Sequence, residues 1–210
     1  MNMPNAQPPY RLNIGCGRNI LAGFINVDSA ALPGVDLVCD LESVRLSPLA
    51  LPSESVAVFL LSHVIEHIRD SLGLMQELWR VARPDAQAVI RVPHGASDDA
   101  WEDPTHVRPY FPSSFVYFSQ PAYWRADYGY RADWQPVRVT LLVPRGRCAN
   151  LTHEQVMHRI ETGRNMVREM VCELRCVKPL RPPKLALQTP PDVELVLVDD
   201  CTHARPRRFR

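Results

Sequence analysis

The apolar residues of this chain gather in short runs that polar, glycine and proline residues separate. Runs of four to seven apolar residues bounded by turn-forming residues are typical of buried β-strands. The pattern predicts seven strands, at residues 10–14, 24–27, 35–39, 56–61, 88–92, 137–143 and 193–198.

Two segments carry apolar residues at the spacing of a helix instead. Apolar residues spaced three and four apart predict a helix over 68–82, which ends before Pro84 because proline disfavours helical geometry in the preceding residue. The same spacing over 156–177 predicts a second helix. Strands joined by helical crossovers imply an α/β fold with a doubly wound, mostly parallel sheet of seven strands.

An aromatic and proline-rich insertion follows the fifth strand, at about residues 94–134. Residues 101–134 alone hold eleven of the sixteen aromatic residues of the chain. We expect a single domain over residues 1–203, in which this insertion covers an acceptor site, followed by a basic tail at 204–210 with four arginines.

Charge, apolar runs and cysteine spacing indicate whether the protein binds nucleic acid, spans a membrane or forms disulfides. The net charge is +1, from 24 basic and 23 acidic residues, so no nucleic-acid partner is expected. The longest apolar run, at 56–61, is too short to span a bilayer, and the first ten residues do not resemble a signal peptide. The six cysteines form no CxxC pair, which favours free thiols and a cytoplasmic location. The oligomeric state stays open.

A glycine turn follows the first predicted strand, in the string NIGCGRN. Gly15 and Gly17 allow a sharp turn and a close approach of a ligand to the backbone. Asp28 and Asp40 close the next two strands, where a carboxylate can accept hydrogen bonds from a ribose. Position 20, where a dinucleotide site would have its third glycine, is Ile20. The pattern therefore predicts a nucleoside site without a pyrophosphate.

Five strings in order, LNIGCG, NVD, CDLES, LSHVIEHI and LMQELWRVARPDAQAVIRVP, resemble the motifs of class I S-adenosylmethionine-dependent methyltransferases. The likeness covers about residues 11–93 and is to the compact bacterial branch called methyltransferase type 11. It implies a Rossmann-like methyltransferase fold, enzymatic methyl transfer, and S-adenosylmethionine as the cofactor.

The resemblance also assigns residues to the cofactor site. Gly15 and Gly17, with Asn13 and Cys16 beside them, would pass under the methionine part of the cofactor. Asp28 would hold the ribose. The adenine would lie beside Asp40 and Leu41, and the sulfonium beside Ser62 and His63. Two departures stand out: the helix expected after the glycine turn is nearly absent, and RPDA replaces the usual KPGG.

The string HVIEH at residues 63–67 also matches the HxxEH signature of zinc peptidases. That chemistry needs all three residues within one helix and a further protein ligand. Because His63 directly follows a predicted strand, we set the zinc hydrolase aside as a remote alternative and expect no metal site. A divalent metal held by His94, an aspartate and His106 is a less favoured alternative, because the spacing of these residues is not diagnostic.

The acceptor side offers three histidines as candidate bases, His106, His63 and His94, because each follows the end of a strand. His106 is the first choice, since a proline turn, Arg108 and Tyr110 surround it in sequence. The expected acceptor is a small molecule or a glycan, methylated on oxygen or nitrogen. The alternative is a non-catalytic interaction protein built on the same fold.

Overall fold

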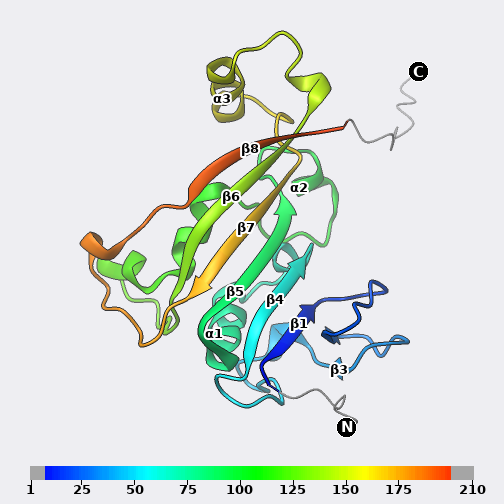
Figure 1. Ribbon diagram of the computed structural model, residues 1–210, viewed down its shortest axis with the longest axis vertical. Helices are drawn as coiled ribbons and strands as arrows, with labels where there is room; N and C mark the ends of the chain where they lie inside the picture. Colours follow the sequence, from blue (N-terminus) through cyan, green and yellow to red (C-terminus); the bar gives the residue numbers. More distant parts are fainter. Residues whose placement is uncertain (1–7, 200–210) are drawn as a thin grey trace.

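One eight-stranded sheet forms the centre of the computed structural model, which describes residues 8–199 (Figure 1). The strands lie in the order β3-β2-β1-β4-β5-β7-β6-β8. Their bounds are β1 Tyr10–Ile14, β2 Ile25–Asp28, β3 Leu37–Val38, β4 Val56–Ser62, β5 Ala82–Pro93, β6 Trp134–Pro144, β7 Glu169–Cys176 and β8 Asp192–Val198.

Neighbouring strands run parallel except at β7, which is antiparallel to both β5 and β6. The predicted mostly parallel, Rossmann-like sheet is thus confirmed, with eight strands in place of seven. The helices are α1 Ser71–Val81, α2 Asp99–Glu102 and α3 His153–Thr162, with 3-10 turns η1 Leu41–Ser43, η2 Ile65–His67, η3 Pro112–Phe118, η4 Gln120–Trp124, η5 Arg145–Arg147 and η6 Leu185–Leu187.

The first predicted helix is confirmed as α1, which begins three residues later than the apolar spacing suggests. The Asp70 carboxylate accepts a hydrogen bond from the backbone N–H of Gly73 at 2.8 Å and so caps the helix. Residues 65–67, which the apolar spacing leaves just outside the helix, form the short turn η2.

The second predicted helix, over 156–177, is wrong in its second half. Helix α3 ends at Thr162, and β7 occupies residues 169–176. Met170, Cys172, Leu174 and Cys176 alternate with polar or half-buried residues, and all four are buried. This period of two is the strand signal, and pairing on both edges of β7 satisfies its backbone.

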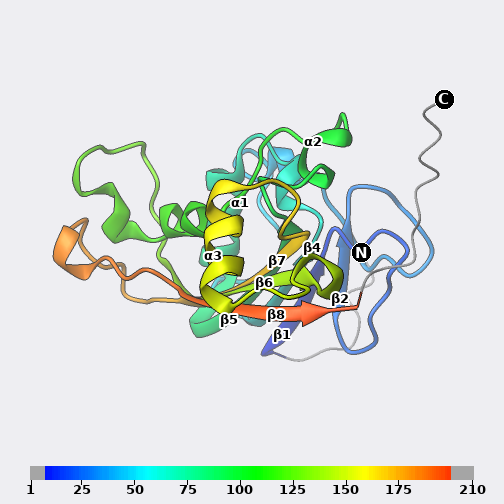
Figure 2. The ribbon, with the colours of Figure 1, turned by 90° about the horizontal axis from the view of Figure 1, so that it is seen from above.

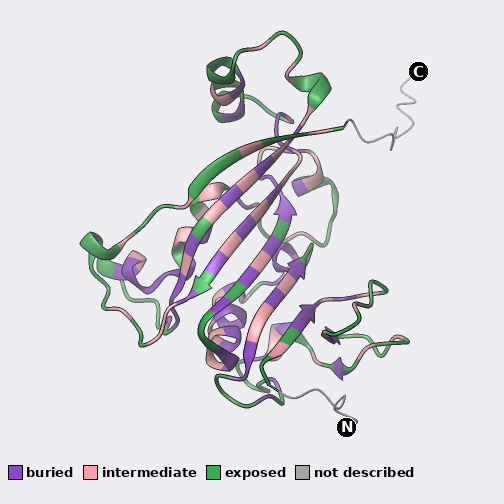
Figure 3. Ribbon diagram, viewed as in Figure 1, coloured by how far each residue is buried: buried purple, intermediate pink, exposed green. Residues whose placement is uncertain are grey.

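The α-helices lie on one face of the sheet (Figure 2). Buried and exposed residues alternate along the strands (Figure 3). In β5, Ala88, Ile90 and Val92 are buried, while Gln87 and Arg91 are exposed. The open face carries polar and half-buried side chains, which tolerate contact with water.

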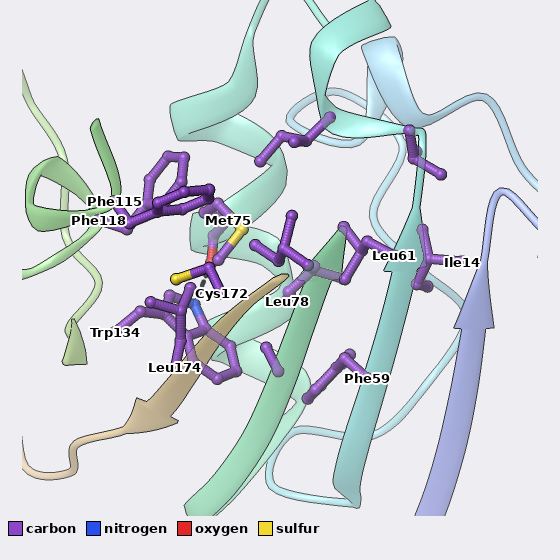
Figure 4. Close-up of a cluster of buried hydrophobic side chains, with 14 of the residues drawn as sticks. Ile14, Phe59, Leu61, Met75, Leu78, Phe115, Phe118, Trp134, Cys172 and Leu174 are labelled. Atoms are coloured by element: carbon purple, nitrogen blue, oxygen red, sulfur yellow. Dashed lines mark hydrogen bonds between the residues drawn. The ribbon is translucent and has the colours of Figure 1, made fainter. Parts of the chain in front are cut away.

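The core lies between the sheet, α1 and the aromatic insertion (Figure 4). Trp134 is fully buried, packs edge-to-face on Phe59 with ring centroids 5.6 Å apart, and donates its indole N–H to the carbonyl of Met75 at 2.9 Å. Phe115 and Phe118 of the insertion belong to the same core, so the insertion packs as a structural layer.

Within residues 8–199, none of the helices has the length and apolar character that crossing a bilayer requires. The predicted basic tail, 204–210, lies outside the described residues.

Candidate functional site

The glycine turn follows β1 with both glycines in the left-handed region, Gly15 at φ +60° and Gly17 at φ +52°. A Cβ atom on Gly15 would lie 2.4 Å from Cγ2 of Val64, so the packing of the fold itself requires this glycine. A Cβ on Gly17 would meet no atom within 4 Å. Space for a ligand therefore lies beside Gly17 rather than Gly15.

Asp28 stands at the end of β2, directly beside the glycine turn. Its Oδ2 accepts a hydrogen bond from the N–H of Gly17 at 2.7 Å, and its Oδ1 accepts one from the N–H of Ala30 at 3.0 Å. A carboxylate has about four lone-pair positions, so each oxygen can accept a further donor. Asp28 thus fixes the turn and still offers acceptors to a ligand.

Two buried asparagines hold the loop between β1 and β2, which contains no helix. The Asn13 amide donates to the carbonyl of Asn19 at 2.8 Å and to Oδ1 of Asn26 at 3.0 Å. Asn26 in turn accepts from the N–H of Leu21 and donates to the Asp36 carboxylate. The Asn13 side chain therefore supports the loop from inside.

The end of β3 offers an exposed carboxylate and a buried leucine. Asp40 caps η1, accepting from the N–H of Glu42 at 3.0 Å and from the hydroxyl of Ser43 at 2.6 Å. The Ser43 hydroxyl and the Glu42 N–H lower the pKa of Asp40. Leu41 is buried, so it would meet a ligand chiefly through its backbone.

His63 follows exposed Ser62 at the end of β4, with a left-handed φ of +55°. Its Nε2 lies 3.5 Å from Oε1 of Glu169, and its Nδ1 lies 3.3 Å from Oε1 of Glu66. These two carboxylates, Glu169 foremost, raise the pKa of His63 to about 9. The imidazole is therefore charged at neutral pH and is poorly suited to act as a base.

Sequence reasoning missed Glu169, because it placed this residue inside a predicted helix. As the first residue of β7 it lies beside the end of β5, where Arg91 donates to its carboxylate. The alternation of apolar and polar residues along 169–176 was the signal that could have predicted a strand here and so placed Glu169 next to the end of β5.

His94 is buried directly after the end of β5. Its Nδ1 accepts from the N–H of Ala96 at 3.2 Å, and its ring packs edge-to-face on Phe111 at 5.4 Å. Burial lowers the pKa of His94. These contacts make His94 a packing residue at the entry of the insertion.

His106 has a hydrogen bond at Nδ1 only, and its Nε2 lies 4.0 Å from Oδ2 of Asp103. Its Nδ1 lies 3.2 Å from the carbonyl of Ala100, which can only accept, so Nδ1 carries the proton and Nε2 keeps its lone pair. That nitrogen can accept a proton or bind a cation.

A pocket of about 460 Å³ lies between the start of α1 and the aromatic insertion. Arg108 reaches its wall and donates to the Ser71 hydroxyl at 2.9 Å. The pocket is lined by Ser71, Leu72, Arg108, Tyr110, Phe111, Ser113, Ser114, Tyr117, Phe118, Tyr123 and Tyr128.

Segment 62–71 joins the pocket to the glycine turn. On one side Val64 packs against Gly15. On the other, the Ile65 carbonyl accepts from the hydroxyl of Tyr110 at 3.3 Å. The predicted cofactor residues and the predicted acceptor side thus share one connecting segment.

Comparisons with known proteins agree with this geometry. Residues 12–90 match the family model of a methyltransferase domain. A methyltransferase structure from Archaeoglobus fulgidus, described as SAM dependent, superposes with a TM-score of 0.55 at 18% identity, covering 79% of this chain and 86% of that one. A structure from Thermotoga maritima, described as a SAM-dependent methyltransferase and possible histamine N-methyltransferase, gives 0.50 at 14% identity, covering 79% and 81%. No curated protein matches the sequence significantly. The predicted resemblance is confirmed over residues 12–90, and the likeness in fold extends further.

Proposed function

We propose that this chain, whose residues 12–90 match a methyltransferase domain, is a class I S-adenosylmethionine-dependent methyltransferase. It methylates a small-molecule or glycan acceptor bound in the pocket between α1 and the aromatic insertion. The observation that carries the proposal is the shared segment 62–71, which contacts the glycine turn through Val64 and the pocket wall through Ile65.

The residues present fit the cofactor. Open space beside Gly17 leaves room for a ligand against the backbone, and Asp28 keeps acceptor positions for ribose hydroxyls. Asp40, exposed at the next strand end, can accept from an adenine amine. S-adenosylmethionine would supply a methyl group on a positively charged sulfur.

An oxygen or nitrogen of the bound acceptor would take the methyl group, S-adenosylhomocysteine would leave as the neutral sulfide, and the acceptor proton would pass to bulk water. This chain's contribution is to hold the acceptor in line and keep water away. Aromatic walls and the hydroxyls of Ser71, Ser113 and Ser114 suit a sugar or a flat ring that carries polar groups.

The test is titration calorimetry with S-adenosylmethionine, followed by a screen of sugars and hydroxylated aromatic compounds for release of S-adenosylhomocysteine. We expect cofactor binding by the wild type and its loss in Gly17→Val, with the fold retained by circular dichroism.

Tyr128→Ala, which removes an exposed pocket wall, should raise the KM of the acceptor and leave cofactor affinity unchanged. Trp124→Ala removes an aromatic side chain outside the pocket and is the matched control. A folded wild type that binds no cofactor would instead support the alternative of a non-catalytic interaction protein. The predicted cytoplasmic location stays a prediction.

A further inference from the structure

Three acceptor groups meet outside the proposed cofactor site, from Glu66, His67 and His106. One ligand atom of each lies within 4.8 Å of the other two. Glu66 and His67 belong to turn η2 after β4, and His106 comes from the insertion, where the N–H of Val107 donates to the Glu66 carbonyl at 2.9 Å. Two distant segments are thus fixed against each other at this cluster.

Glu66 lacks the partners that a buried carboxylate needs. The residue is 2% exposed, and among residues 8–199 no donor makes a hydrogen bond to either of its carboxylate oxygens. His63 approaches Oε1 at 3.3 Å as an ion pair, but it also serves Glu169. The charged His63 ring offsets part of the burial cost at Oε1, but neither carboxylate oxygen accepts a hydrogen bond from the described residues. A second cation would complete the surroundings of this buried carboxylate.

In both histidines, Nδ1 carries the proton and contacts an oxygen of the protein, which leaves Nε2 unprotonated. The Thr105 hydroxyl donates its one hydrogen to Oδ1 of Asp103 at 2.6 Å, so at 2.9 Å from Nδ1 of His67 it must accept. His67 therefore carries its proton on Nδ1, as His106 does toward the Ala100 carbonyl. Each ring then has a lone pair on Nε2, and the rings pack with centroids 4.7 Å apart. The Asp103 carboxylate lies 4.0 Å from Nε2 of His106, which adds negative charge beside the cluster.

A carbonyl or hydroxyl that fixes the far nitrogen of each histidine is the arrangement that surrounds metal-bound imidazoles. Zinc takes nitrogen and carboxylate ligands at about 2.0–2.2 Å, often three from the protein with a fourth position open. Atoms no more than 4.8 Å apart reach that geometry with shifts of roughly 1 Å.

We infer that Glu66, His67 and His106 bind a divalent transition-metal cation of the zinc class. The last two residues of HVIEH are then ligands, but not in the arrangement of a peptidase helix. His63, the first residue of that string, pairs with Glu169 instead. His106 acts in this site as a ligand rather than as a base. The inference does not depend on the proposed methyl transfer.

The full chain, stripped with a chelator, is titrated with ZnCl2 by calorimetry and with Co2+ by visible absorption. We expect one zinc per chain and the intense cobalt bands of a four-coordinate site. His67→Gln and His106→Gln should each weaken zinc binding at least 100-fold and remove the cobalt bands. Thr105→Val, which removes only the hydroxyl that orients His67, should weaken binding about 10–100-fold.

His158→Gln, on the exposed side of α3, is the matched control and should bind as the wild type does. Circular dichroism checks each variant for folding. Should His106→Gln fail to fold, half-exposed His67 carries the test. A folded wild type that binds no zinc would overturn the inference, and so would unchanged zinc binding in His67→Gln, because another site would then hold the metal.

Discussion

Replacing Gly15 by alanine should destabilise the protein by about 2–5 kcal/mol, and replacing Gly17 by about 1–2 kcal/mol. Both glycines have a left-handed φ, which costs an L-residue about 1–2 kcal/mol. Only at Gly15 does the new methyl group also meet a neighbour, Cγ2 of Val64 at 2.4 Å. Forcing a methyl group into a packed site adds about 1–3 kcal/mol.

Urea unfolding followed by circular dichroism measures both free energies. A double-mutant cycle isolates the contact: in Gly15→Ala with Val64→Ala, about 1–3 kcal/mol should be recovered relative to the sum of the single variants. Calorimetric titration with S-adenosylmethionine should show a lower cofactor affinity for Gly17→Ala, although the fold of this variant stays close to that of the wild type. Equal destabilisation at the two glycines, or strict additivity with Val64→Ala, would refute the reasoning.

Three further outcomes are expected. Asp28→Ala should weaken S-adenosylmethionine binding by about 1.5–3 kcal/mol in calorimetry, since a charge-assisted acceptor is lost; unchanged affinity would remove Asp28 from the ribose site. Arg181→Met should lower the free energy of unfolding by about 3–5 kcal/mol in urea, because fully buried Asp133 loses its bidentate partner at 2.6 and 2.8 Å; a loss below 1 kcal/mol would contradict this. Arg108→Ala should raise the KM of an anionic acceptor and spare a neutral one in steady-state kinetics, since the guanidinium lines the pocket; equal effects on both would assign Arg108 a purely structural role.

The sequence predicts most of the sheet because short apolar runs bounded by turns identify strands without knowledge of their neighbours. It fails at β7, where apolar residues fit both a helical spacing and an alternation, and only pairing with β5 and β6 decides between them. Because residues 169–176 are predicted as helix, the contact between Glu169 and His63 is not predicted either; it forms only when this segment is a strand.

The sequence predicts where the candidate residues lie along the strands, but it does not predict their contacts. Gly15, Gly17 and Asp28 do lie together at the end of β1 and β2. The contact that requires Gly15 comes from Val64, and the support for the loop comes from Asn26, which no motif indicates. The grouping of His67 with His106 depends on how the insertion returns to the sheet, and local spacing carries no information on that.

The loop after β1 is held by amide side chains and contains no helix, and this has a consequence for how the molecule opens. Strands β2 and β3 have only four and two residues, so few backbone bonds tie residues 15–39 to the rest of the sheet. This edge should exchange its amide hydrogens through local opening, well before the strands β4, β5 and β7 do. A ligand that touches both Gly17 and Asp28 closes that opening and slows exchange there by mass action. Because binding must also order residues 15–39, the observed cofactor affinity is lower than the contacts alone would give. A change that makes residues 15–39 more rigid should therefore raise the affinity.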